Sequence, residues 1–278
     1  MSAHFFVLVV FAISIAAGLL GALTGLGGGI VVTPALTLLL GVDIRYAIGA
    51  SLVSVVATSS GAAAAYVRDG LSNIRIGMFL EVATTVGAIA GALLASKAPT
   101  SALAILFGLV LLHSAWQVVQ PQKQQVVTGP ADPLAQRLRL AGVYTSPQGD
   151  VAYRVSRAKS GFGLMYVAGM LSGMLGIGSG ALKVIAMDRV MGMPFKVSTA
   201  TSSFMIGVTA VASAAIYLKR GYIQPLIALP VMLGVLCGSI LGARLLAHLP
   251  VKTLRRLFAI VVAVIAVQMI AHGLHGGK

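Results

Sequence analysis

Long apolar runs recur along the whole chain and limit what it can fold into. A run of 18 or more apolar residues is long enough to cross a lipid bilayer as a helix. Only 9% of the 278 residues are charged, whereas a soluble domain carries about 25%. The first run, His4–Leu23, lacks the basic start of a signal peptide, so we interpret it as a membrane segment. The sequence therefore predicts an all-α polytopic membrane protein.

The chain is strongly basic, with 20 Lys and Arg residues against 6 Asp and Glu residues. The basic residues lie mainly in short connectors between the apolar runs, as the positive-inside rule describes for membrane proteins. Because no basic stripe carries interleaved aromatic residues, we expect no nucleic-acid partner. The single cysteine, Cys237, excludes an intrachain disulfide and a cysteine-cluster metal site, and we expect neither a metal nor a cofactor.

An internal repeat divides the chain into two halves. Ala17-Gly18 matches Ala168-Gly169, and this offset of 151 residues aligns further residues without a gap. The matched pairs are Gly25/Gly176, Gly27/Gly178, Gly29/Gly180, Gly41/Gly192, Ser51/Ser202, Thr58/Thr209, Tyr66/Tyr217, Gly70/Gly221, Gly87/Gly238, Gly91/Gly242, Pro99/Pro250 and Phe107/Phe258. We therefore predict a first transmembrane repeat at residues 1–119, a cytoplasmic linker loop at 120–160 and a second transmembrane repeat at 161–278.

Each half is predicted to contain a long helix, a glycine break, a short apolar segment and three more transmembrane helices. The long helices are expected at Phe5–Leu23, Tyr46–Tyr66, Ile76–Ala95, Ala102–Val119, Phe162–Leu175, Val197–Leu218, Ile223–Ala247 and Thr253–His272. The short segments are Ile30–Leu40 and Ala181–Met191. As helices they would span about 16 Å, roughly half of the ~30 Å hydrocarbon core. They are therefore predicted to be re-entrant half-helices.

The glycine break permits two arrangements of the halves. A kink inside one helix gives an even number of membrane elements per half and parallel repeats, whereas a hairpin gives an odd number and inverted repeats. The hairpin places 15 Lys and Arg residues inside and 5 outside, and the kink places 11 inside and 9 outside. Because this bias sets orientation, we predict inverted-topology repeats with both termini periplasmic.

The two glycine breaks are the predicted binding site. Short, glycine-interrupted segments at matching places in two halves are typical of a transporter site. A helix N-terminus presents free N–H groups and a positive dipole to an anion, and glycine lets the anion approach the backbone. The predicted anion-binding residues are Thr24, Gly27, Gly28, Gly29, Thr33, Ser51, Gly176, Gly178, Ser179, Gly180, Lys183 and Ser202.

Several of these residue types also have purely structural explanations. Glycines permit close helix packing, which is our interpretation of the segments Gly87–Gly91 and Gly238–Gly242. Hydroxyl side chains in apolar helices often bond their own backbone carbonyls. Lys183 either lines a cavity or extends to the cytoplasmic face. Glu81, an acidic residue inside an apolar helix, is a candidate for proton coupling or for pairing with Arg75.

Four segments resemble the sulfite exporter TauE/SafE family, a group that includes toluene-sulfonate uptake permeases. They are GLLGALTGLGGGIVVTPAL from Gly18, RYAIGASL from Arg45, GMLSGMLGIGSG from Gly169 and STATSSFMIG from Ser198. The resemblance covers nearly the whole chain apart from the central loop.

Some residues depart from the pattern of that family. Pro34 follows the first half-helix start, but Ile185 stands at the paired position of the second. Ser179 replaces a glycine expected in the second break. Together with Lys183 and the long central loop, these differences indicate a subgroup.

The resemblance implies a multi-pass transporter of the bacterial cell inner membrane, with sulfite or a small organosulfur or sulfonate anion as its substrate and export as its direction. An enzyme is not expected, since the chain contains no HExxH motif, no paired intramembrane aspartates and no G-x-S-x-G elbow. The alternatives are an anion channel and a membrane scaffold without transport. The expected partners are the anion, the lipid bilayer, a coupling proton or sodium ion, and a second copy in a homodimer.

Overall fold

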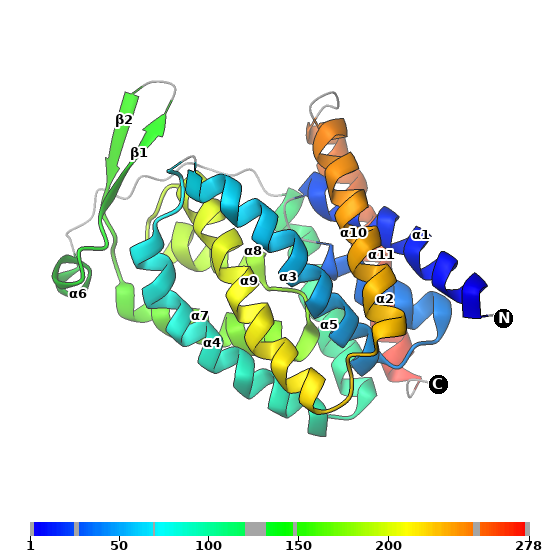
Figure 1. Ribbon diagram of the computed structural model, residues 1–278. Coiled ribbons are helices and arrows are strands. Elements are labelled where there is room, and N and C mark those ends of the chain that lie inside the picture. Colours follow the sequence, from blue (N-terminus) through cyan, green and yellow to red (C-terminus); the bar gives the residue numbers. More distant parts are fainter. Residues whose placement is uncertain are drawn as a thin grey trace.

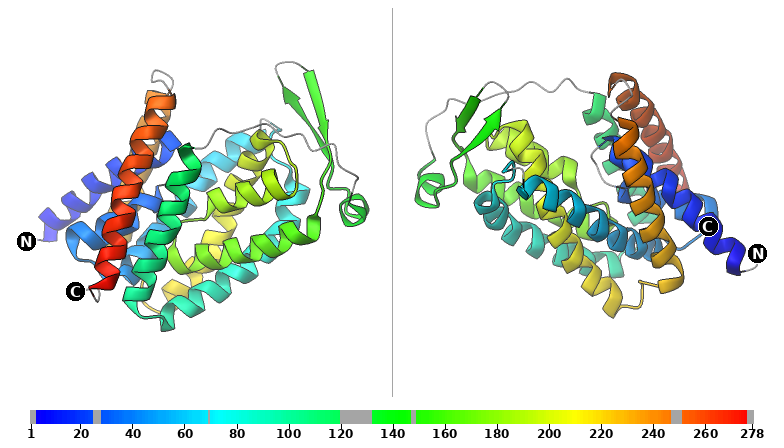
Figure 2. Two further views of the ribbon diagram at one scale, coloured as in Figure 1. Left: turned by 180° about the vertical axis from the view of Figure 1, so that it is seen from behind. Right: turned by 45° about the horizontal axis from the view of Figure 1, so that its top comes forward.

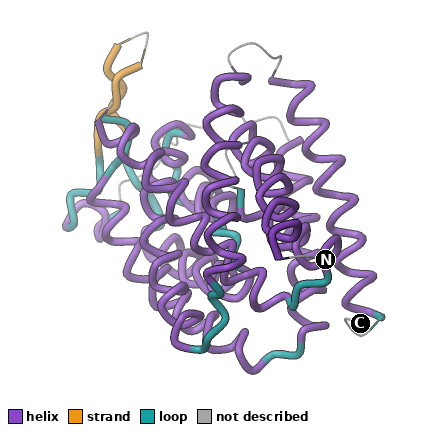
Figure 3. The backbone as a smooth tube through the Cα atoms, turned by 45° about the vertical axis from the view of Figure 1, so that its right-hand side comes forward, coloured by secondary structure: helices purple, strands orange, loops and turns teal. Residues whose placement is uncertain are grey.

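The structure of the chain, a computed structural model, is a bundle of helices with one small β-hairpin among its described residues (Figure 3). It describes residues 3–24, 28–68, 70–119, 132–146, 149–246 and 251–275. The first half contains α1 (Ala3–Thr24), α2 (Gly29–Leu40), α3 (Ile44–Arg68), α4 (Ile74–Lys97) and α5 (Thr100–Val119). The second contains α7 (Ala158–Leu175), α8 (Gly180–Ile185), η1 (Ala186–Val190), α9 (Phe195–Lys219), α10 (Pro225–Leu246) and α11 (Val251–Leu274) (Figure 1).

The helices agree with the sequence prediction to within a few residues at each end. The exception is the predicted short segment Ala181–Met191, in which α8 continues as a π-helix, η1. Three described helical stretches are long and apolar enough to cross a membrane: Ile74–Lys97, Thr100–Gln117 and Phe195–Lys219. Shorter apolar helical stretches accompany them, and large side chains such as Leu8 and Leu39 are exposed on the outside of the bundle. This surface suits lipid rather than water, so the chain is a helical membrane protein.

In each half, the helix that follows the glycine break lies beside the helix that precedes it. In the second half, the Ser179 hydroxyl donates a 2.7 Å hydrogen bond to the carbonyl oxygen of Ala168. These two residues would lie about 16 Å apart in a continuous helix. In the first half, a Cβ added to Gly28 would lie 3.5 Å from the Cα atom of Gly18. These two contacts are the ones that a hairpin predicts and that one continuous helix would not allow.

Helices of one half pack against helices of the other in a reciprocal pattern. Helix α1 packs on α10, and the equivalent pair is α7 on α4. Helix α3 packs on α9, and α5 packs on α11, so these equivalent helices pair with each other (Figure 1). Because the first helix of each half has its main partner in the other half, the two halves form one interleaved body.

Glycines allow the interleaved helices to approach closely. A Cβ at Gly18 on α1 would overlap a backbone oxygen of α10, and a Cβ at the equivalent Gly169 on α7 would overlap a backbone oxygen of α4. Both glycines of the segment Gly87–Gly91 meet the backbone of α7 in the same way, and Gly238 meets the backbone of α1. The packing interpretation is therefore confirmed for Gly87, Gly91 and Gly238, whereas the surroundings of Gly242 are not described.

The equivalent helices that pair with each other run antiparallel. The N–H group of Asn73, just beyond α3, donates a 3.0 Å hydrogen bond to Thr201 near the start of α9. At the opposite end, a Cβ at Gly49 near the start of α3 would overlap the backbone of Tyr222, just beyond α9. Helices α5 and α11 are also antiparallel, because Gly273 at the end of α11 packs on the start of α5.

The central segment is not the simple loop that the sequence predicts. It contains α6 (Pro133–Arg137) and an antiparallel hairpin of β1 (Gly142–Ser146) and β2 (Gly149–Tyr153), so the fold is not purely helical (Figure 2). The hydroxyl of Tyr153 accepts a 2.7 Å hydrogen bond from Asn73, before α4. The Asp132 carboxylate accepts hydrogen bonds from the backbone N–H groups of Ala158 (2.7 Å) and Leu134 (2.9 Å), and these bonds lower its pKa. The linker thus docks on the starts of α4 and α7.

Candidate functional site

The two glycine breaks meet at the side chain of Ser51 on α3. Its buried hydroxyl lies 2.9 Å from the carbonyl oxygen of Gly176 and 3.2 Å from that of Gly29. A Cβ at Gly29 would lie 3.0 Å from the Gly176 oxygen, so the two backbones pack directly. The breaks of the two halves therefore lie side by side in the protein interior.

Ser202 repeats part of this geometry in the second half. Its hydroxyl donates to the carbonyl oxygen of Gly180 at 3.3 Å, and the equivalent distance from Ser51 to the Gly29 oxygen is 3.2 Å. Both contacts join the first residue of a short helix, α2 or α8, to the helix that follows it. Ser51 differs because it also reaches across to the other half.

The second break adopts left-handed backbone conformations. Gly176 has a φ of 67° and Gly178 a φ of 70°, which glycine tolerates readily. Ser179, the residue that replaces a glycine of the family pattern, has a φ of 44°. A left-handed conformation is unfavourable for a non-glycine residue, and the hydrogen bond from its hydroxyl to Ala168 offsets part of this cost.

A track of polar positions follows one face of α2 away from the break. Gly29, Thr33 and Thr37 are spaced four residues apart and so lie along nearly the same side of the helix. Thr33 is fully buried and Thr37 is 6% exposed, yet neither hydroxyl has a hydrogen-bond partner among the described residues. A buried hydroxyl without a partner costs about 1–3 kcal/mol. These two positions therefore favour a polar ligand or water beside α2.

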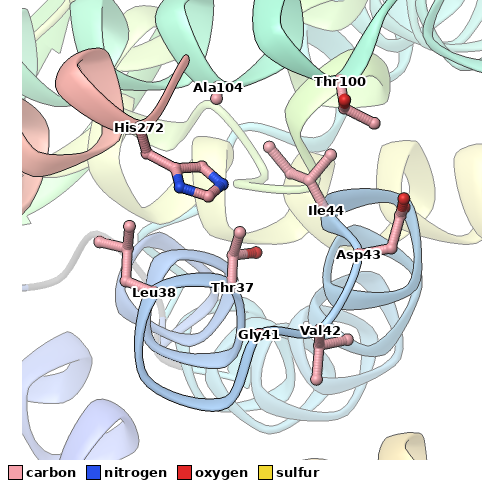
Figure 4. Close-up of a pocket in the computed structure, with 9 residues that line it drawn as sticks. All are labelled: Thr37, Leu38, Gly41, Val42, Asp43, Ile44, Thr100, Ala104 and His272. Atoms are coloured by element: carbon pink, nitrogen blue, oxygen red, sulfur yellow. The ribbon is translucent and has the colours of Figure 1, made fainter. Parts of the chain in front are cut away.

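The track ends in a cavity of about 270 Å³ at the C-terminal end of α2. In Figure 4 the imidazole ring of His272, from α11, lies above Thr37. Segments from α2, α3, α5 and α11 contribute the lining residues, which are Thr37, Leu38, Gly41, Val42, Asp43, Ile44, Thr100, Ala104 and His272. The four-residue spacing from Thr33 would have identified Thr37 in the sequence. Nothing in the sequence indicates His272, which comes from the other end of the chain.

A second polar cluster joins α4, α8 and α9. Lys183 is fully buried, and its ammonium group donates a 2.6 Å hydrogen bond to the Thr209 hydroxyl. Thr209 lies 2.8 Å from Oε1 of Glu81, which also accepts a 3.0 Å hydrogen bond from Thr85. Oε2 of Glu81 is buried and has no partner among the described residues. Lys183 therefore does not extend to the surface, and Glu81 interacts with Thr209 instead of Arg75.

This charged cluster has no counterpart at the positions that the repeat makes equivalent to it. Thr58 is the equivalent of Thr209 in the first half, but its hydroxyl bonds the carbonyl oxygen of Ser54 in its own helix. Val32 and Met232 are the equivalents of Lys183 and Glu81. The cluster therefore breaks the similarity of the two halves, unlike the paired serines at the breaks.

The predicted site residues thus fall into three groups. Gly28, Gly29, Gly176, Gly178, Ser179, Gly180, Ser51 and Ser202 lie at or beside the breaks, where the prediction placed them. Thr33 continues along α2, while Lys183 and Glu81 belong to the charged cluster. Gly27 and the side chain of Thr24 lie outside the described residues. Sequence reasoning missed Thr209, which joins Lys183 to Glu81.

Comparison with known families decides the class of the protein. The profile of the family described as "Sulfite exporter TauE/SafE" matches residues 10–269. The chain belongs to this family. As a TauE/SafE protein it is a membrane transporter and not an enzyme. No solved structure matches the chain.

Similar proteins occur in several bacteria. The chain is 29% identical to "Probable membrane transporter protein YunE" of Bacillus subtilis, over 97% of this chain and 98% of the relative. It is 27% identical to "Probable membrane transporter protein YdhB" of the same organism, over 90% and 92% of the two chains. A "Probable membrane transporter protein" of Haemophilus influenzae is 26% identical, over 95% of this chain and 98% of its own length.

Proposed function

We propose that this TauE/SafE protein is a secondary transporter that exports sulfite or a related small sulfonate anion across the bacterial inner membrane. The observation that carries the proposal is the track along α2. The hydroxyls of Thr33 and Thr37 are buried and have no partners among the described residues, and they lie between the junction of the breaks at one end of the helix and the cavity at the other. This track gives a polar anion a route through otherwise apolar helices.

The chemistry of the track suits a small oxyanion. Moving an anion into a bilayer is costly because it loses its hydration shell, so the protein must supply replacement donors. Thr33 and Thr37 supply hydroxyl donors, and the N-terminal end of α2 adds free N–H groups and a positive dipole end. Neutral donors replace the hydration shell of the anion without holding it as tightly as a fixed full charge, which allows release.

The helix arrangement supports inverted repeats around this route. Equivalent helices pack antiparallel, and both glycine breaks are hairpins, which gives each half an odd number of membrane elements. The cavity lies at the C-terminal ends of α2 and α11 and the N-terminal end of α5. The linker docks on different helix ends, the starts of α4 and α7. The distribution of Lys and Arg residues favours a cytoplasmic position for the end of the bundle on which the linker docks. The cavity would then open toward the periplasm, on the side of both termini.

Reporter fusions test this orientation. A periplasmic reporter fused after residue 278 should be active, and the same reporter inserted within residues 120–131 should be inactive. An active reporter in the linker, or an inactive one at the C-terminus, would contradict the inverted arrangement.

Flux measurements in liposomes test the transport function. Wild-type protein should move sulfite with a saturable rate, whereas an anion channel would give a rate that does not saturate and a scaffold would give none. Thr33→Val and Thr37→Val should each weaken sulfite binding about 10-fold or more, because a hydrogen bond to a charged group contributes about 1.5–3 kcal/mol. Thr199→Val is the matched control, since that hydroxyl bonds the carbonyl oxygen of Phe195. Equal sulfite affinity in all three variants would place the anion elsewhere.

A further inference from the structure

Thr209 is a hydroxyl bridge between two buried side chains of opposite charge. Its Oγ1 atom lies 2.6 Å from Nζ of Lys183, 2.8 Å from Oε1 of Glu81 and 2.8 Å from the carbonyl oxygen of Met205. A hydroxyl group has one hydrogen to donate and two lone pairs to accept. The ammonium group can only donate and the carbonyl oxygen can only accept. The protonation state of Glu81 therefore decides how many of the three contacts are hydrogen bonds.

An ionised Glu81 leaves one of these contacts without a hydrogen. The Thr209 hydrogen then points either to Glu81 or to Met205, because Lys183 supplies its own hydrogen to Oγ1. When Glu81 carries a proton, that proton is donated to Oγ1, and the Thr209 hydrogen turns to the Met205 carbonyl. All three contacts are then hydrogen bonds. The same heavy-atom positions thus accept both states, and proton uptake requires only rotation of a hydroxyl hydrogen.

The charge surroundings of Glu81 are simple in the part of the chain that the structure describes. Lys183 on α8 faces it through Thr209. The Tyr166 side chain on α7 is 39% exposed, so it is oriented at least partly away from the interior. The remaining described titratable side chains of α4, α7, η1 and α9 lie near the ends of these elements, and they are Arg75, Lys97, Lys159, Asp188, Arg189, Lys196, Tyr217 and Lys219.

Charge balance connects this proton with the anion. Lys183 lies one helical turn beyond Gly180, at the start of α8 beside the second break, so the cluster and the break share one short helix. A charged Lys183 and an ionised Glu81 together are neutral. A monovalent anion added to that pair would leave a net negative charge in the membrane interior, which is costly. Protonation of Glu81 restores neutrality, with Lys183 balancing the anion.

We propose that Glu81 binds one proton for each monovalent anion that the protein binds, so that anion and proton cross the membrane together. The inference rests on the proposed transport of a small anion and adds its coupling ion. It also assigns roles within the cluster. Lys183 balances the anion, Glu81 holds the proton, and Thr209 positions the two. The overall direction of movement then follows the sum of the anion gradient and the proton gradient.

Anion binding as a function of pH tests the coupling. Methanesulfonate is a suitable probe, because it does not itself titrate near neutral pH. In wild-type protein its dissociation constant should rise up to tenfold for each unit of pH on the alkaline side, since binding then requires uptake of a proton. Glu81→Gln mimics the neutral acid, so its dissociation constant should not change with pH as long as Lys183 keeps its charge. Thr58→Val, at the position equivalent to Thr209, should retain the wild-type pH dependence.

An infrared measurement without any anion tests the proton site separately. Wild-type protein should show the carbonyl band of a buried carboxylic acid, this band should decrease as pH rises, and Glu81→Gln should lack it. Absence of the band at every pH, or equal pH dependence of binding in wild type and Glu81→Gln, would overturn the proposal. If the band is present but neither methanesulfonate nor sulfite binds at any pH, the proposed anion transport fails while the proton site stands.

Discussion

Replacement of Ser51 by alanine tests whether one hydroxyl holds the two breaks together. The Ser51 hydroxyl is 2.9 Å from the Gly176 oxygen and 3.2 Å from the Gly29 oxygen, and it is completely buried. Its removal leaves the carbonyl oxygen of Gly176 in the interior without this donor. An unsatisfied buried acceptor costs about 1–3 kcal/mol, so Ser51→Ala should lower the free energy of unfolding by that amount.

Ser202→Ala is the matched control for this experiment. Ser202 is also buried and stands at the equivalent position, but it makes a single hydrogen bond of 3.3 Å to Gly180 within its own half. A bond of that length is weak, so the expected loss is about 0.5–1 kcal/mol. Both losses can be measured by denaturant unfolding in detergent.

The two variants should also differ in function. Because Ser51 connects the breaks, Ser51→Ala should weaken sulfite binding by more than Ser202→Ala does. A loss of stability in Ser202→Ala that equals or exceeds the loss in Ser51→Ala would refute the reasoning, since the contact between the halves would then contribute nothing beyond local packing.

Three further predictions concern the charged cluster, the helix crossings and the linker. Lys183→Met alone should lower stability by about 3–5 kcal/mol, because it leaves a buried charge without compensation, whereas Lys183→Met combined with Glu81→Met should recover most of the loss in the same unfolding assay. Gly91→Ala should cost about 1–3 kcal/mol through overlap with the α7 backbone, whereas Gly163→Ala, which meets open space in a helix, should be neutral or stabilising by up to about 1 kcal/mol. The pKa of Asp132 is lower in the folded protein, so its carboxylate stabilises linker docking above the unfolded pKa and ceases to do so as pH falls through the folded pKa. Protease cleavage of the linker should therefore increase at acidic pH, and Asp132→Asn should remove this acid transition. An unchanged transition in the variant would contradict the assignment.

The sequence predicts most helices of this protein because length and apolar composition alone decide whether a segment can cross a bilayer. The glycine breaks are also visible in it, since glycines mark both turns at the same offset. The charge bias favoured a hairpin over a kink, and the contact between Ser179 and Ala168 agrees with that choice. The small hairpin of the linker was missed, although β-branched and aromatic residues such as Val143, Tyr144 and Val151 favour strands.

The contacts that define the site depend on packing between distant segments. Lys183, Thr209 and Glu81 lie on three helices from both halves, and each residue alone has an ordinary explanation in the sequence. Nothing in the spacing of these residues indicates that one threonine joins the two charges. Likewise, the repeat predicts that Ser51 and Ser202 are equivalent, but it does not predict that only Ser51 reaches the opposite break.

The interleaving of α1 with α10 has a consequence for biosynthesis. The ribosome delivers α1 to the membrane long before its main partner α10 has been translated. Until then the glycine-lined side of α1, including Gly18, can contact only lipid or transient neighbours. The N-terminal half is thus incomplete as a folding unit, and α1 reaches its final neighbour only after α10 has been translated. A nascent chain that stops in the linker would leave α1 without the surface on which it packs.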